Sequence, residues 1–244
     1  MRPLVFLDLD DTLFSTLRKN PTASIPVAFN RQGEWLSYMS SGQRLFLDWL
    51  ARDAQVVPTT GRNRAAFERV RLDFDGFAIC SFGGLILTPD GQPETRWHTR
   101  MERAALEHET PLERVVQRVL SVAAATGADV RARVIFDAGL PLYASIKHNQ
   151  DDGASLATLA LESEHFVPAG WRMHLNDNNM SVMPPFLGKE FAVAWFMEEI
   201  ASHRSFALGV GDSLSDAPFM ALCDYVIAPS RSQLFSLIAS QAVQ

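Results

Sequence analysis

The segment between Pro3 and Thr12 constrains the fold more than any other part of the chain. Five apolar residues, Pro3 to Leu7, lead directly into Asp8-Leu9-Asp10-Asp11-Thr12. A short, continuous apolar run predicts a strand that is buried on both faces. Side chains two residues apart in an extended backbone point to the same side, so Asp8 and Asp10 can address one reaction centre. Because buried carboxylates repel one another, the rest of the chain should supply a compensating cation, lysine or proton.

Three later segments supply partners for this acidic strand end. They are Val56-Val57-Pro58-Thr59-Thr60-Gly61-Arg62, Gly188-Lys189 at the start of a helical run, and Leu208-Gly209-Val210-Gly211-Asp212-Ser213-Leu214-Ser215-Asp216. With D-x-D-x-T they resemble, in the right chain order, the four signatures of the haloacid dehalogenase-like (HAD) superfamily of phosphotransferases. Each segment is a weak indication alone, but the four together outweigh a strand end that is merely capped by a solvated acidic turn.

The pattern of apolar runs predicts an α/β fold. Runs near residues 3–8, 54–59, 77–81, 206–210 and 224–228 predict buried parallel strands, and helical patterns near 45–50, 65–70 and 191–197 lie between them. Such alternation predicts a Rossmann-like, doubly wound parallel sheet, which is the HAD core. Asp8, Thr60 and Asp212 all fall at carboxyl ends of strands, where ligands collect in such sheets.

The middle of the chain predicts a second, α+β unit, inserted between the second and third signatures. Strand-like segments at about 130–136, 142–146 and 171–175 accompany a helix at about 153–162. Thr110-Pro111-Leu112-Glu113 offers a helix N-cap, a proline at the first helical position and a capping-box glutamate. The insertion resembles the C2-type cap of the Cof-like and sugar-phosphate phosphatase branches, although Ser81-Phe82-Gly83-Gly84 stands where many relatives have Asn-Gly. The predicted domains are residues 1–84 and 184–244 for the core and 85–183 for the cap.

Composition narrows the range of partners and compartments. The 244-residue chain carries a formal net charge of −6, which argues against a nucleic-acid backbone or an anionic membrane as its main partner. Cys80 and Cys223 are its two cysteines, and both lie in apolar runs, so a reducing compartment is expected rather than a disulfide framework. No signal-peptide pattern and no apolar run of membrane-spanning length is present, which predicts a cytoplasmic location. Residues 25–36 predict two short strands around a turn.

The resemblance implies a role for each motif residue in phosphate-ester hydrolysis. Asp8 is the expected nucleophile, which forms an aspartyl-phosphate, and Asp10 the expected general acid and base. The Thr60 hydroxyl is expected to donate to a phosphate oxygen. Arg62 either contacts substrate or pairs with a carboxylate in the core, and Asp11 is expected to point away from the site.

The same resemblance implies a Mg²⁺ site and a lysine that neutralises charge. Asp212, the Asp8 carboxylate and the Asp10 backbone carbonyl are the expected ligands. Lys189 is expected to neutralise Asp8 and the phosphate. Asp216 is expected to hold Lys189, and a helix-capping role for Asp216 competes or coexists.

Polar residues of the predicted cap are candidates for substrate recognition. Lys147 and Asn176 are the two chosen for the site, from a wider set of Arg131, Arg133, Lys147, His148, His174 and Asn176. The leading interpretation is a Mg²⁺-dependent phosphatase of a small phosphorylated metabolite, such as a sugar phosphate. The alternatives are a phosphomutase resembling phosphomannomutase and a catalytically silent binding module with the same fold.

Overall fold

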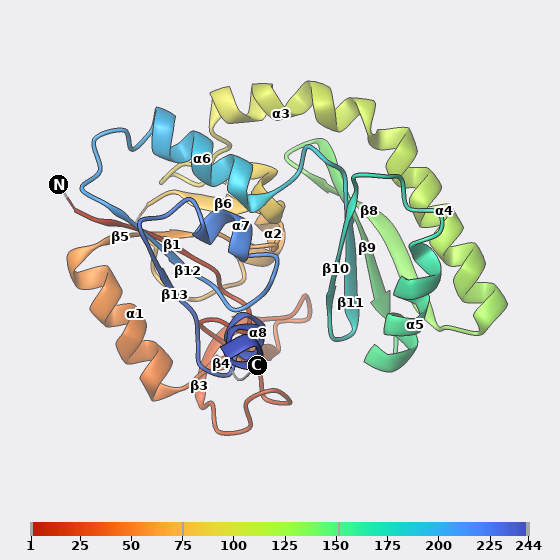
Figure 1. Cartoon of the computed structure of the whole chain (residues 1–244), viewed down its shortest axis with the longest axis horizontal. Coiled ribbons are helices and arrows are strands. Elements are labelled where there is room, and N and C mark those ends of the chain that lie inside the picture. The colour runs from red at the N-terminus through yellow and green to blue at the C-terminus, as the bar shows by residue number, and fades with distance from the viewer. Residues whose placement is uncertain (1, 75, 151, 243–244) are drawn as a thin grey trace. The chain divides into compact units, whose positions relative to one another are not determined.

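The computed structural model describes residues 2–74, 76–150 and 152–242 (Figure 1). Contacts divide the chain into two compact units, Met1–Glu94 with Lys189–Gln244, and Thr95–Gly188. The boundaries expected from sequence, at 84/85 and 183/184, lie slightly earlier in the chain. Within the described residues, no helix combines the length and the apolar character that crossing a membrane requires.

A parallel four-stranded sheet forms the centre of the first unit. Its order is β13-β12-β1-β5, with β1 at Leu4–Leu7, β5 at Gln55–Pro58, β12 at Ala207–Val210 and β13 at Tyr225–Ile227. All four residues of β1 are buried, as its unbroken apolar sequence predicts. The predicted parallel α/β sheet is therefore confirmed.

Helices cover both faces of this sheet. Val5 and Leu7 belong to a core that includes Leu47 and Leu50 of α1 (Ser41–Asp53). On the opposite face Phe6 meets Phe196 of α6 (Lys189–Glu199), with ring centroids 5.7 Å apart. Alternate residues of one strand thus serve two layers, which is the doubly wound arrangement.

Short elements complete the first unit. Three strands form a small antiparallel sheet in the order β2-β4-β3, with β2 at Ser15–Thr16, β3 at Ile25–Phe29 and β4 at Trp35–Met39. The hairpin predicted at residues 25–36 is therefore present. The remaining helices are α2 (Arg64–Phe67), α7 (Ala217–Met220) and α8 (Gln233–Ala242).

The segment after β5 is anchored by an unusual turn. β6 (Ala78–Cys80) pairs antiparallel with β7 (Leu85–Leu87), and it reaches β5 only through a parallel bridge between Thr59 and Ile79. Between β6 and β7, the 3-10 turn η1 (Ser81–Gly83) places Ser81 at φ 51° and Phe82 at φ 54°. Both residues are buried, although side chains other than glycine, asparagine and aspartate rarely adopt this left-handed conformation.

The second unit is an antiparallel sheet with helices packed on one face. Its strand order is β10-β11-β9-β8, with β8 at Val130–Asp137, β9 at Leu140–His148, β10 at Arg172–Asn176 and β11 at Asn179–Met183. α4 (Glu109–Thr126) and α5 (Gly153–Ser163) cover this sheet, and α3 (Thr95–Glu107) precedes α4 (Figure 1). The shared core contains Leu112, Val119, Ile146, Leu156 and Met180.

Three details of the predicted elements are wrong. The strand predicted as parallel near 77–81 is β6, which pairs antiparallel with β7 and meets β5 only at the parallel bridge between Thr59 and Ile79. Thr110 is not an N-cap, because α4 begins at Glu109 and the Leu112 N–H donates to the His108 carbonyl at 2.9 Å. β13 is parallel as predicted but not fully buried, since Tyr225 is 65% and Val226 is 59% exposed. Its place at the sheet edge leaves these side chains without a covering layer.

Candidate active site

The register of the central sheet brings three strand ends together. Leu7, the last residue of β1, pairs with Pro58 of β5 and with Val210 of β12. Asp8, Thr59 and Gly211 follow these three residues, so Asp8, Thr60 and Asp212 emerge at one edge.

The carboxylate of Asp8 is buried and bound to a buried lysine. Lys189, the first residue of α6, donates to Oδ1 of Asp8 and to Oδ1 of Asp216, both at 2.6 Å. The side chains of Lys189, Asp8 and Asp216 are 4%, 8% and 1% exposed. Two carboxylates and an ammonium group from distant parts of the chain therefore form one buried ionic cluster.

Thr12 connects Asp8 to the third carboxylate. Its hydroxyl lies 2.9 Å from Oδ2 of Asp8 and 3.1 Å from Oδ1 of Asp212. A hydroxyl has one proton, so it donates to one of these oxygens at a time. Thr12 is the threonine of the D-x-D-x-T motif, and its position in the sequence alone does not predict this bridging role.

Asp216 is fully occupied by protein donors. One oxygen accepts from Lys189, while Oδ2 accepts from the Ser213 hydroxyl at 2.7 Å, the Ser213 N–H at 3.1 Å and the Asp212 N–H at 3.3 Å. Gly211 permits this packing, because a Cβ there would lie 2.6 Å from Cβ of Asp216. Asp216 therefore shapes the loop after β12 and holds Lys189, and it makes no side-chain cap to α7.

Burial and repulsion within the cluster shift the ionisation of its members. Burial, followed by the charge of Asp216, raises the pKa of Asp8 well above its ordinary value despite Lys189. Burial and Asp216 likewise raise the pKa of Asp212 to about 6. Burial opposes ionisation of Asp216 too, but Lys189 and Ser213 lower its pKa. Lys189 has a raised pKa, since its two carboxylate partners outweigh its burial.

The donor set fits a divalent cation. Oxygen atoms of Asp8, Asp212 and Asp216 lie within 4.8 Å of one another, and among the described residues Lys189 is the cation in direct ion pairs with this group. The fully ionised cluster would keep two uncompensated negative charges, and carboxylate oxygens are the ligands that Mg²⁺ prefers. Asp216 accepts four hydrogen bonds, three of them at Oδ2, whereas Asp8 accepts one at each oxygen and Oδ2 of Asp212 has no donor among the residues that the structure describes. Asp8 and Asp212 are thus the side chains that fit a metal.

Asp10 lies in a separate ion pair with Arg62. The Arg62 Nε and Nη2 atoms each donate to one oxygen of Asp10 at 2.7 Å, and the guanidinium lies 5.2 Å from the centroid of the Phe14 ring. Of the two roles predicted for Arg62, contact with substrate or pairing with a carboxylate, the structure shows the pairing with a carboxylate. Asp11, with φ 65°, pairs instead with Lys19.

Thr60 is buried beside Arg62 in the loop after β5, and hydrogen bonds from the turn η1 hold this loop in place. The Thr60 hydroxyl accepts the Arg62 N–H at 3.1 Å, and within the described chain its own proton has no acceptor. Ser81 N–H donates to the Arg62 carbonyl at 2.7 Å and Phe82 N–H to the Thr60 carbonyl at 3.1 Å. A Cβ at Gly61 would lie 2.6 Å from the Phe82 ring, so the glycine allows this contact.

Lys147 and Asn176 belong to the second unit. The pairs Arg131–Lys147, Lys147–Asn179 and Asn179–Asn176 form one row across the four strands. Ile146 and Met180, which neighbour this row along their strands, pack in the core under α4 and α5. Because successive side chains alternate between faces, Lys147 and Asn176 share the face away from these helices.

Comparison with known proteins identifies the fold. Neither a family model nor a curated protein matches the sequence. The C-terminal domain of trehalose-6-phosphate phosphatase from C. albicans matches 89% of the chain with 72% of its own length, at a TM-score of 0.60 and 16% identity. Sucrose-phosphatase from Synechocystis sp. PCC6803, solved with sucrose and phosphate, matches 100% of the chain with 98% of its own length, at a TM-score of 0.53 and 14% identity. A haloacid dehalogenase-like hydrolase from Bacteroides thetaiotaomicron matches 99% of the chain with 100% of its own length, at a TM-score of 0.51 and 13% identity.

The chain has the HAD-like hydrolase fold. The match spans both compact units, so the cap is part of the likeness. In this chain the first, third and fourth motifs supply the residues of the cluster around Lys189, and the second supplies Thr60 and Arg62. The sequence did not reveal the pairing of Asp10 with Arg62, since spacing alone does not determine which cation a carboxylate meets.

Proposed function

We propose that this protein is a Mg²⁺-dependent phosphatase that hydrolyses a small phosphate ester, such as a sugar phosphate, through an aspartyl-phosphate on Asp8. The observation that carries the proposal is the buried Asp8 carboxylate, held by Lys189 at one oxygen and by Thr12 at the other. This arrangement fixes the carboxylate in one orientation, as in-line attack on phosphorus requires.

The surrounding groups suit a charged transition state. Phosphoryl transfer spreads negative charge over the phosphate oxygens, and Lys189 together with the Thr60 hydroxyl are the donors that we assign to them. Asp8 and Asp212 would hold Mg²⁺, with the Asp10 backbone carbonyl as a third ligand. The metal would neutralise phosphate oxygens and thereby ease attack by Asp8.

Asp10 is the group that we assign to proton transfer. Arg62 binds both oxygens of Asp10, so we infer that the Asp10–Arg62 pair opens during turnover and lets Asp10 approach the leaving oxygen. We assign this step to the substrate, because its anionic phosphate competes with Asp10 for Arg62. Asp10 then protonates the leaving oxygen and later activates the water that releases phosphate.

Two solved phosphatases with the same fold support the proposed substrate class. One is a trehalose-6-phosphate phosphatase, and the other is a sucrose-phosphatase that was solved with sucrose and phosphate. We assign Lys147 and Asn176 to substrate recognition because they share the polar face of the cap sheet. The partner that we propose is a small molecule, with no nucleic acid and no membrane. Neither Cys80 nor Cys223 forms a disulfide among the described residues, which favours the cytoplasm.

A panel of phosphate esters, assayed with Mg²⁺ for free phosphate and for isomerised product, tests the proposal. Asp8→Asn should abolish phosphate release, because the change is nearly isosteric but removes the nucleophile. Asp11→Asn is the matched control, since Asp11 pairs with Lys19 and asparagine tolerates its positive φ. Phosphate release by folded Asp8→Asn would contradict the covalent mechanism. Isomerised product would favour the mutase, and inactivity on every ester would favour a silent binding module.

A further inference from the structure

A hollow on the second unit shares no residue with the carboxylate cluster, which belongs to the first unit. It has a volume of about 520 Å³, and all of its lining residues come from α4, the residue before it and the segment after α5. They are His108, Pro111, Arg114, Val115, Arg118, Phe166, Pro168 and Trp171. Sites for small molecules commonly measure about 300–1,000 Å³, so the hollow has the size of a ligand site.

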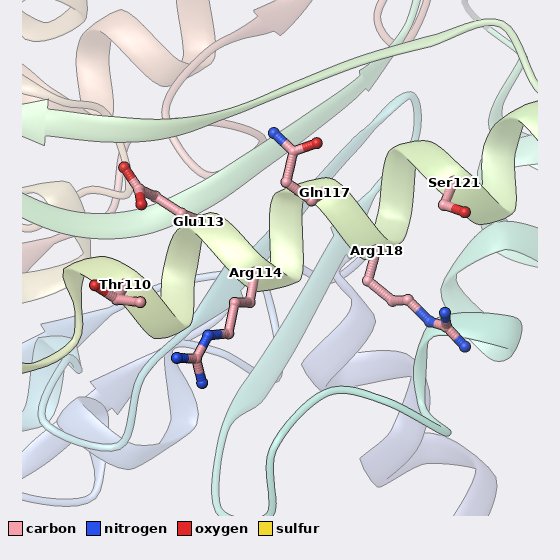
Figure 2. A pocket seen from close by; sticks show the side chains of 6 residues that line it. All are labelled: Thr110, Glu113, Arg114, Gln117, Arg118 and Ser121. Atoms are coloured by element: carbon pink, nitrogen blue, oxygen red, sulfur yellow. The ribbon is translucent and has the colours of Figure 1, made fainter.

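Two arginines one helical turn apart form the charged side of this hollow. Figure 2 shows Arg114 and Arg118 leaving α4 on one side, whereas Glu113 and Gln117 leave it on the other. Both arginines are exposed, and neither has an ion-pair partner in the part of the chain that the structure describes. Like charges four residues apart destabilise a helix, so Arg114 and Arg118 do not stabilise α4. Their paired positive charge instead favours the binding of an anion.

Aromatic rings form the other side. The Arg118 guanidinium lies 5.8 Å from the centroid of the Phe166 ring. The His108 ring lies 5.9 Å from that of Trp171 and 5.0 Å from that of Phe186, and its Nδ1 lies 2.7 Å from the Ala104 carbonyl oxygen. These contacts orient Arg118 and His108 before any ligand arrives, which reduces the entropy lost on binding.

The chemistry of the lining selects a type of ligand. The residues around the hollow include two guanidinium groups, an imidazole, an indole and a phenyl ring, and no carboxylate. Guanidinium groups bind phosphate through paired hydrogen bonds, and flat rings stack on aromatic side chains and on proline. We propose that this hollow binds a small anion that carries a planar aromatic ring, with the chemistry of a nucleoside monophosphate.

Calorimetric titration with AMP, adenosine and inorganic phosphate tests the site directly. The titrations use the full chain in EDTA, where the excess negative charge of the carboxylate cluster repels anions from the core. AMP should bind with one-to-one stoichiometry, and adenosine and phosphate should each bind at least about tenfold more weakly, because each offers half of the recognised chemistry. Phosphate or adenosine binding as tightly as AMP would overturn the proposal, as would AMP that does not bind at millimolar concentration.

Arginine variants locate the binding. Arg114→Gln and Arg118→Gln should each weaken AMP binding about tenfold or more, since each removes a charge-assisted hydrogen bond. Arg103→Gln is the matched control, because Arg103 is an exposed arginine of the same unit that pairs with Glu107. Equal weakening in all three variants, or in none, would show that AMP binds elsewhere or by net charge alone. In the NMR spectrum, AMP should also shift the indole N–H signal of Trp171, identified by its absence in Trp171→Phe.

Discussion

Replacing Lys189 by glutamine should destabilise the first unit more than any surface substitution. The change removes the ammonium group that lies 2.6 Å from both Asp8 and Asp216, in a site where all three side chains are at most 8% exposed. Removing one partner of a buried ion pair leaves an uncompensated buried charge, which costs about 3–5 kcal/mol of the free energy of unfolding. Since Lys189 serves two carboxylates, we expect a value near the upper end, about 5 kcal/mol.

Urea unfolding in EDTA measures this loss, followed by circular dichroism. Asp216→Asn, alone and combined with Lys189→Gln, completes a double-mutant cycle. The two groups are in contact, so their coupling energy should be at least about 1 kcal/mol. Arg44→Gln is the control within the same unit, because the Arg44–Asp48 pair is half exposed and should contribute no more than about 0.5 kcal/mol.

The pH dependence of this loss follows from the pKa shifts. Asp216 has a lowered pKa when folded, so its contribution is present above the ordinary value of 3.8 and is lost as pH falls. Lys189 has a raised pKa, so its contribution is present below 10.5 and is lost only as pH rises past that value. Neither of these groups changes its contribution between pH 5 and 8 in the wild type. In Lys189→Gln the buried carboxylates have lost their cation and take up protons as the pH falls, so the difference from wild type should be large at pH 8 and smaller at pH 5. A loss below about 1 kcal/mol at pH 8, or additive effects in the cycle, would refute the buried ionic cluster.

Three further predictions concern the metal, the loop after β12 and the cap. Mg²⁺ at a concentration 100-fold above its Kd should stabilise the wild type by about 2.7 kcal/mol in thermal unfolding, and Asp212→Asn should lose this stabilisation. Equal stabilisation of the wild type and Asp212→Asn would contradict Asp212 as a metal ligand. Gly211→Ala should destabilise by about 1–3 kcal/mol in urea, because its Cβ would lie 2.6 Å from Cβ of Asp216, whereas Gly42→Ala, with its nearest contact at 3.8 Å, should not. Lys147→Ala and Asn176→Ala should lower turnover of the best ester in the panel far more than turnover of p-nitrophenyl phosphate; equal losses in folded variants would remove both residues from substrate recognition.

The sequence predicts the core of the site better than its details. Asp8, Thr60 and Asp212 could be assigned to one edge because each follows an apolar run, and parallel strands align their carboxyl ends. The partners of Lys189 follow from the motif resemblance, although 181 residues separate it from Asp8. The Asp10–Arg62 pair could not be derived, since it depends on how the loop after β5 is held by Phe82.

The misplaced helix start has a local physical cause. Thr110-Pro111 is a common way to begin a helix, but here α4 begins two residues before Pro111. The first four N–H groups of a helix lack partners inside it, so a proline in this turn removes no hydrogen bond. His108 itself has helical backbone angles, φ −101° and ψ 0°, and α3 ends one residue before it. The sequence signal for a helix start is therefore accurate only to within the first turn.

The left-handed residues Ser81 and Phe82 lower the stability of the protein while they hold the loop that contains Thr60 and Arg62. An L-residue in this conformation costs roughly 1–2 kcal/mol, and the turn keeps two of them in succession. In return, their N–H groups fix the backbone of Thr60 and Arg62. Substituting glycine for Ser81 relieves the positive φ without adding volume at this fully buried position, and it should thus make the protein more heat-resistant while leaving every charged group in place. Any accompanying fall in turnover would measure how much of the catalytic rate depends on a rigid loop rather than on the carboxylates themselves.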